Sequence, residues 1–251
     1  MENVTKKERY YLLDSLRGLA LLLMRFYHAI WDLIYMFRAS VPWFTPTFDR
    51  VLQRFICITF ISVSGFCFSL GSHKLRRSLT VLLASAVITL ATLIAMPRNI
   101  IVFGVLSLIG ICMLIATLAE RLLIKINPYV GATACLVLYI LTQNVYLGIL
   151  GIGSFSITLP SFLYANYFTA FLGFPHPEFL SSDYFSLFPW CFIFFFGFFL
   201  YQIFKRQMLL RFLKRPRIKP LEAVGRHTLI IYMLHQPIIF GALYIIFSIM
   251  K

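Results

Sequence analysis

Long apolar segments alternate with short polar ones along this chain. Each apolar segment has about the 20 residues that an α-helix needs to cross the roughly 30 Å hydrocarbon core of a bilayer. This pattern predicts an all-α fold, a polytopic transmembrane helix bundle of about seven spans. The seven segments run roughly from Leu16 to Phe37, Phe48 to Leu70, Leu79 to Met96, Ile100 to Ala119, Pro128 to Leu150, Tyr184 to Phe204 and Val224 to Ile249.

An eighth apolar segment, Phe155 to Phe174, is interrupted by Pro160, Asn166 and Gly173. Its pattern is compatible with a crossing, a re-entrant segment or an external amphipathic lid. Lys and Arg residues concentrate in cytoplasmic loops of membrane proteins, and an eighth crossing would move the basic cluster of 205–226 to the outside. The distribution of the 23 Lys and Arg residues therefore favours seven spans, with the N-terminus cytoplasmic and the C-terminus external.

We expect a single transmembrane domain over residues 1–251. Its cytoplasmic parts include the basic N-terminus, 1–13, and the basic loop, 205–226. The connection 151–183 is the longest one predicted on the external side. Such a connection is often a lid over a binding cavity, and a filler segment lying on the surface is the open alternative.

Composition supports the membrane assignment. The chain is 60% hydrophobic and only 13% charged, far from the average of soluble domains. Its net charge of +14 does not indicate nucleic-acid binding, because the basic residues lie between apolar segments. The lipid bilayer is the expected partner. The 5 cysteines are scattered singly, so we expect no metal site and no disulfide framework.

A polar stripe runs along the first apolar helix. Arg17, Arg25, His28 and Asp32 follow at helical spacing, so they share one face. Arg or Asp at the centre of a span costs about 2.5–3.5 kcal/mol, and such groups normally face a watery cavity or pair with one another. An ion pair of Arg25 that only fixes helix packing is one interpretation. A functional cavity is favoured, because a histidine between the charges is suited to accept a proton.

His28 lies near the predicted bilayer centre, about 16 Å further along the helix axis than Arg17. The last apolar helix brings His235 to a similar depth, followed by Gln236 and Pro237. Pro237 leaves one backbone carbonyl of the helix without its usual donor, which is tolerated beside a cavity or a neighbouring helix. A buried histidine that bonds across helices is the open alternative for His235.

Five groups of motifs follow one another along nearly the whole chain. They are Leu13 to Ala20 with Met24, His28 and Asp32; Ser64-Gly65; Phe103 to Leu106 with Ile109-Gly110; Asp183 to Phe185 with Phe188 to Trp190 and Gly197; and Gly225-Arg226 with Leu229, Tyr232 and His235 to Pro237. In this order they resemble the bacterial relatives of heparan-α-glucosaminide N-acetyltransferase. The spacing from Arg17 to His28 is also similar to that of membrane acyltransferases that acetylate envelope sugars.

The resemblance implies an acyl-CoA donor, acetyl-CoA above all, that enters from the cytoplasm, and transfer to an amine or hydroxyl outside. The acceptor is expected to be a small molecule or glycan. Two departures concern Ser107, where many relatives have histidine, and the loop Arg38 to Asp49, which lacks the histidine of the lysosomal enzyme. Glucosamine of heparan is therefore not the expected substrate.

We expect Arg17 to bind the phosphates of coenzyme A, with Lys6, Lys7 and Arg226 as helpers. The planar guanidinium group of arginine binds phosphate through two parallel hydrogen bonds. This assignment places the donor at the cytoplasmic end of the polar stripe.

The catalytic prediction centres on His28, which would deprotonate the acceptor or carry the acyl group itself. Asp32 would orient His28 or raise its basicity. Arg25, His235 and Tyr232 would stabilise the oxyanion that develops on the carbonyl oxygen.

Two other classes compete with an enzyme. A proton-coupled transporter also uses intramembrane His, Arg and Asp residues, but inverted repeats are not detectable in this sequence. A noncatalytic scaffold leaves the shared stripe unexplained. We expect a multi-pass protein of the cell membrane, the plasma membrane of a bacterium, and a homodimer remains open.

Overall fold

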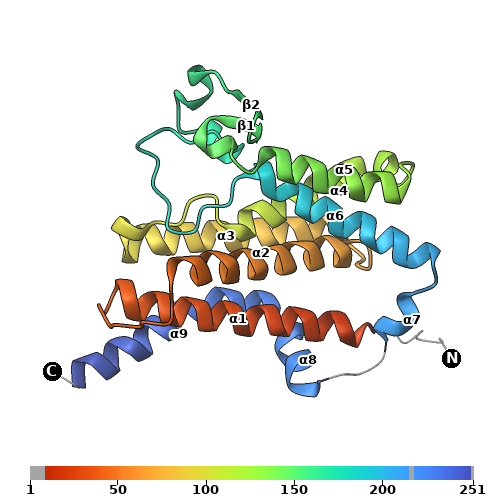
Figure 1. Ribbon diagram of the computed structural model, residues 1–251. Coiled ribbons are helices and arrows are strands. Elements are labelled where there is room, and N and C mark those ends of the chain that lie inside the picture. Colours follow the sequence, from red (N-terminus) through yellow and green to blue (C-terminus); the bar gives the residue numbers. More distant parts are fainter. Residues whose placement is uncertain (1–8, 215–217, 250–251) are drawn as a thin grey trace. The chain divides into compact units, whose positions relative to one another are not determined.

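The computed structural model describes residues 9–214 and 218–249, and its regular structure is helical apart from one β-hairpin (Figure 1). The prediction of an all-α polytopic helix bundle is confirmed. In chain order the elements are α1 (Tyr11–Tyr35), α2 (Pro46–Phe68), α3 (Lys74–Ala95), η1 (Pro97–Asn99), α4 (Val105–Leu123), α5 (Pro128–Thr142), η2 (Val145–Leu147), β1 (Ile149–Ile152), β2 (Phe155–Thr158), η3 (Ser161–Tyr164), η4 (Thr169–Phe171), α6 (Leu187–Arg206), α7 (Leu210–Leu213), α8 (Lys219–Arg226) and α9 (Thr228–Ile249).

Six helical segments of the described chain are long and apolar enough to cross a membrane: α2, α3, α4, α5 extended to Leu147, α6 and α9. Helix α1 has 25 residues. At 1.5 Å per residue it measures about 37 Å, which also suffices for a crossing. Helix α1 is not among the six apolar segments because its polar stripe carries charged residues. The chain is thus a multi-pass membrane protein, and the seven-span count and the sides of its termini stay predictions.

The eighth apolar segment does not form a membrane-crossing helix. Between α5 and α6 the described residues 143–186 contain 3-10 turns and the β1–β2 hairpin, and no α-helix. A single hairpin cannot cross a bilayer, because the hydrocarbon core offers no partners for its edge backbone groups.

The chain divides into two compact units, which we describe separately. The first contains the chain up to Val63 and from Phe204 onward, and the second is Ser64–Ile203. The single domain expected over residues 1–251 stays a prediction.

In the first unit, α1 packs against both α8 and α9, and Figure 1 shows α1 beside α9. The apolar side of α1 is buried, including Leu21, Met24 and Ile30. The last apolar segment, predicted as one helix from Val224, is in fact interrupted at His227, between α8 and α9.

The interruption at His227 has a local cause. The backbone leaves helical geometry at this residue, with φ −105° and ψ 30°. The Thr228 hydroxyl then donates to the Gly225 carbonyl at 2.7 Å, which satisfies an acceptor at the end of α8. His235 consequently lies seven residues, or about 10 Å, from the start of its own helix.

In the second unit, α3 packs antiparallel to its neighbour α4 across a short connection. Lys74 of α3 forms an ion pair with Glu120 of α4. The core of this unit contains large aromatic side chains, of which Phe68, Phe194 and Phe198 are completely buried. Phe68 stacks edge-on against Phe194 at 6.1 Å between ring centroids.

Candidate functional site

The polar stripe predicted on the first helix lies on α1, and its members differ in burial. Asp32 is completely buried, Arg25 and His28 are half-buried, and the Arg17 side chain is 25% exposed. The four residues therefore pass from a partly accessible end of α1 into the packed interior of the first unit. Helix α9 packs against α1 and supplies the partners of the deeper residues.

The two candidate catalytic histidines meet between α1 and α9. The ring centroids of His28 and His235 are 5.0 Å apart, and the rings are inclined by 52°. Sequence spacing predicted similar depths for the two residues, and the structure brings the side chains into contact. Tyr232, one turn before His235, lies 5.3 Å from the His235 ring and 6.0 Å from Phe60 of α2.

The orientation of the His235 ring is fixed by the backbone of its own helix. Its Nδ1 forms a hydrogen bond with the Tyr232 carbonyl. A carbonyl only accepts, so Nδ1 carries the proton, and in the neutral ring Nε2 then has the free lone pair. Nε2 is buried and has no hydrogen-bond partner among the described residues. This side chain is therefore arranged as a proton acceptor.

The buried carboxylate of Asp32 bonds to α9 rather than to the neighbouring histidine of α1. Both carboxylate oxygens accept hydrogen bonds from the Gln236 amide nitrogen, at 3.0 and 3.1 Å. Gln236 is a site residue to which the sequence assigned no role. Its amide oxygen is buried and unpartnered within the described chain. Asp32 and Gln236 thus connect α1 to α9 directly beside the histidine pair.

Arg25 lies within electrostatic range of His235. Among the described residues it forms no ion pair with Asp32, although an ion pair of Arg25 was one interpretation of the sequence. Its guanidinium group is thus a positive charge one helical turn before His28, in reach of the histidine pair.

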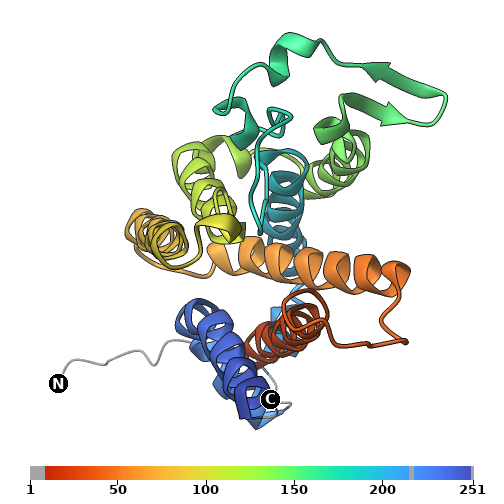
Figure 2. The same ribbon diagram turned by 90° about the vertical axis from the view of Figure 1, so that its left-hand side faces the viewer.

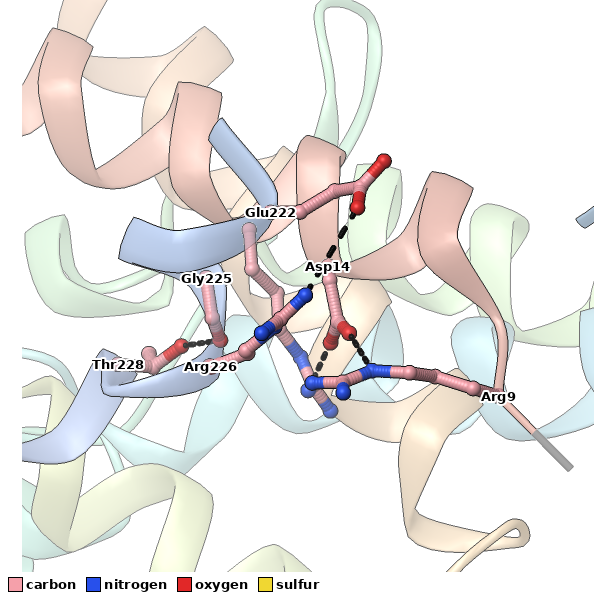
Figure 3. A network of polar contacts seen from close by, with 7 residues as sticks. Arg9, Asp14, Glu222, Gly225, Arg226 and Thr228 are labelled. Atoms are coloured by element: carbon pink, nitrogen blue, oxygen red, sulfur yellow. Dashed lines mark hydrogen bonds and ion pairs between the residues drawn. The ribbon is translucent and has the colours of Figure 1, made fainter. Parts of the chain in front are cut away.

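A second cluster of charges lies where α8 packs on the first turns of α1 (Figure 3). The Asp14 carboxylate is paired with Arg9 at 3.3 Å and with Arg17 at 3.6 Å. On α8, Arg226 is 3.9 Å from Glu222, whose side chain is almost completely buried. Each of the two expected phosphate-binding arginines is therefore positioned by a carboxylate of its own helix.

Asp14 and Glu222 were not predicted as site residues. The signal was nevertheless in the sequence, because each stands three or four residues before the arginine with which it pairs. The expected helpers Lys6 and Lys7 lie outside the described residues. The described residues also contain no group of three or more His, Cys, Asp or Glu side chains suited to a metal ion.

Two glycines allow α8 to approach α1 closely enough to form this cluster. A Cβ atom on Gly18 would lie 2.0 Å from the Leu221 carbonyl oxygen, and one on Gly225 would lie 1.8 Å from the Asp14 carbonyl oxygen. Both distances are far below van der Waals contact, and both obstacles are backbone. The two helices therefore meet backbone to backbone.

We expect Gly225→Ala to destabilise the protein by about 1–3 kcal/mol, because the added methyl group forces the backbones of α1 and α8 apart. Thermal unfolding in detergent measures this effect. The matched control is Gly241→Ala on α9, where a Cβ meets nothing within 4 Å. Alanine there should leave stability unchanged or raise it slightly. Equal unfolding temperatures for the two variants would contradict the close packing.

One family model matches the chain, over residues 9–237, and its description is heparan-alpha-glucosaminide N-acetyltransferase, catalytic. No curated protein and no solved structure matches the chain. The matched range begins just before the Asp14 and Arg17 cluster and ends directly after His235 and Gln236. Since the match covers most of the 251 residues, the chain belongs to the family of heparan-alpha-glucosaminide N-acetyltransferase catalytic domains.

Proposed function

We propose that this protein transfers an acetyl group from cytoplasmic acetyl-CoA to an amine or hydroxyl of an extracytoplasmic acceptor, a sugar or glycan. Family membership implies a membrane acetyltransferase. The observation that carries the finer proposal is the contact between His28 and His235, 5.0 Å apart, on the stripe that begins at Arg17. A candidate phosphate site and a candidate base thus share one helix, α1.

The donor would bind at the α1–α8 cluster. Arg17 and Arg226 each have a partly exposed side chain, and the carboxylates of Asp14 and Glu222 restrict their motion. A pre-oriented guanidinium group loses less conformational freedom when it binds a phosphate than a free one. Lys6 and Lys7 would add positive charge at the same end of α1. From there the pantetheine arm would extend along the stripe toward His28.

The acceptor would lose its proton to the histidine pair. We assign His28 as the general base because it lies on the stripe that begins at Arg17. His235 would be its partner, since the Nδ1 hydrogen bond leaves Nε2 of His235 free to accept a proton. The nucleophile then attacks the thioester carbon, the carbon–sulfur bond breaks, and coenzyme A leaves as the thiolate. The proton held by the histidines can return to that thiolate.

Negative charge develops on the carbonyl oxygen during this attack. Arg25 lies within electrostatic range of His235 and would stabilise that charge. Asp32 would act through Gln236, since its carboxylate accepts from that amide. The pair Asp32–Gln236 would hold α9 so that His235 faces His28.

A binding screen of the detergent-purified protein tests this proposal. Acetyl-CoA and coenzyme A should raise the unfolding temperature, and unrelated nucleotides such as GTP should not, because a ligand stabilises the state it binds. Release of coenzyme A on addition of amino sugars or other glycan acceptors should follow. Protein that neither binds coenzyme A nor releases it from acetyl-CoA would refute the proposal.

A further inference from the structure

The hairpin that follows α5 has one face made only of apolar side chains. Strands β1 and β2 pair antiparallel, with Ile149 opposite Thr158 and Ile152 opposite Phe155. Paired residues point to the same face, and successive residues alternate. One face, the apolar face, therefore consists of Leu150, Ile152, Phe155 and Ile157. The other consists of Ile149, Gly151, Ser156 and Thr158.

The apolar face is largely uncovered. Phe155 is 93% exposed, Ile157 63% and Ile152 50%. Phe155 stands at the tip, next to a two-residue loop in which Gly153 has the positive φ, +53°, that a tight hairpin turn needs at its first position. An amphipathic hairpin whose apolar side is exposed indicates a surface that another apolar phase covers.

The sequence around the hairpin indicates that this phase is lipid. No Lys, Arg, Asp or Glu occurs in residues 126–177, so the hairpin and its flanks are free of the charges usual in an aqueous loop. The membrane-crossing segment Pro128–Leu147 ends two residues before β1 and packs against it. On α5 the exposed side chains include Val137 and Ile140, so an apolar outer surface leads directly to the hairpin.

The direction of the strands agrees with a position at the membrane surface. Figure 2 looks roughly along α5, and both strands lie across that direction, beyond the end of the helix. If α5 crosses the bilayer, the hairpin extends parallel to the membrane plane. Its outer edge has unpaired backbone groups, which the hydrocarbon core cannot satisfy. Water and lipid headgroups can satisfy these groups, and the opposite face carries the hydroxyl groups of Ser156 and Thr158, which are suited to a polar surrounding.

We propose that Ile149–Thr158 is an interfacial anchor, whose apolar face inserts between headgroups and acyl chains of the leaflet at the carboxyl end of α5. The aromatic ring of Phe155 is its deepest group. The anchor ties the beginning of the connection 151–183 to the lipid surface. This inference does not depend on acyl transfer or on which side of the membrane the connection lies.

Fluorescent labelling of two adjacent positions tests the anchor in the whole protein. Phe155→Cys and Ser156→Cys place the same environment-sensitive maleimide dye on opposite faces of one strand. Four of the five native cysteines are buried and Cys57 is half-buried, so the parent protein treated alike gives the background. In phosphatidylcholine liposomes, the dye at position 155 should emit at shorter wavelength and be quenched several-fold more by nitroxide lipids. The dye at 156 should be quenched more by aqueous iodide.

Two results would overturn the anchor. Equal quenching by iodide at both positions would mean that the hairpin extends into water. Protection of position 155 from both quenchers would mean that protein covers the apolar face, as in a contact between two copies of the chain. Both side chains are exposed, so neither substitution removes packing, but Ser156→Cys removes the hydroxyl that donates to the Gly153 carbonyl at 2.8 Å. Unchanged thermal unfolding of each labelled protein therefore has to confirm that the comparison is made on folded material.

Discussion

Acetyl transfer should fall about 10²- to 10⁴-fold in His28→Ala, the usual loss when a general base is removed. The protein should keep its fold and its affinity for acetyl-CoA, because His28 lies eleven residues from Arg17, or about 16 Å along α1. Coenzyme A release at saturating donor measures the rate, and calorimetry measures donor binding. His235→Ala should reduce the rate to a similar degree, since its ring contacts His28 and its Nε2 has no hydrogen-bond partner among the described residues.

The matched control is Phe26→Ala, two residues before His28 on the same helix, with a side chain that is 47% exposed. It should leave the rate near the parent value. If the two histidines act as a unit, the double variant should be about as slow as either single variant. Once one histidine is absent, removal of the other lowers the rate little further. A stable His28→Ala protein that transfers acetyl groups at the parent rate would refute the base assignment.

A purely structural role of the histidine pair gives the opposite pattern. Both alanine variants would then unfold at much lower temperature, and the surviving protein would keep its turnover. Thermal unfolding of the same preparations therefore separates the two explanations. A buried histidine that bonds across helices was the alternative drawn from the sequence for His235. The hydrogen bond found for this ring runs within its own helix, to the Tyr232 carbonyl, which leaves the ring's other nitrogen for chemistry.

The helical part of the fold was readable from the sequence because hydrophobic length is a strong signal. The segment predicted from Phe48 to Leu70 is α2, Pro46–Phe68, and the shared stripe of Arg17, His28 and Asp32 lies on one helix as expected. Both results rest on local geometry, where 3.6 residues per turn fixes which residues share a face. Long-range pairing is different, since it depends on the angle and register of a second helix.

The contacts between α1 and α9 could not be predicted from the sequence, because they depend on the register of one helix against the other. That His235 would contact His28, and that Asp32 would bond Gln236, depends on where α9 begins. The sequence was interpreted as one helix across His227, although the amphipathic α8 is followed there by the uniformly apolar α9. Gly18 and Gly225 were visible only as motif residues, and their importance follows from a close approach of two backbones that no single segment encodes.

The hairpin was missed for a related reason. A stretch such as Ile149–Thr158 is apolar enough to extend a membrane segment, and its alternation is short and begins with two large apolar residues. Gly153 and Ser154 are the turn signal that could have indicated two strands. Hydropathy averaged over about 20 residues does not reveal a change from helical to strand periodicity within ten residues.

Arg17→Ala should weaken coenzyme A binding about 10- to 100-fold, because one charge-assisted hydrogen bond to phosphate contributes about 1.5–3 kcal/mol. Arg17→Lys should recover part of this loss, since lysine keeps the charge but not the planar pair of donors. The effect should shrink as salt rises, because the Arg17 side chain is partly exposed and ions screen its charge. Isothermal calorimetry at low and high salt measures both trends.

Arg76→Ala is the control for general positive charge. Arg76 is an exposed residue of the basic group at the start of α3, predicted to lie on the same side of the membrane as Arg17. The Arg76→Ala variant should bind coenzyme A with nearly the parent affinity, since it loses a positive charge but loses no contact with a phosphate. Asp14→Asn adds a test of positioning: Arg17 then loses its ionised partner at 3.6 Å, and affinity should fall less than in Arg17→Ala. Equal affinity of the parent protein and Arg17→Ala for coenzyme A would place the phosphate site away from the end of α1, and Arg226 would then be the residue to replace next.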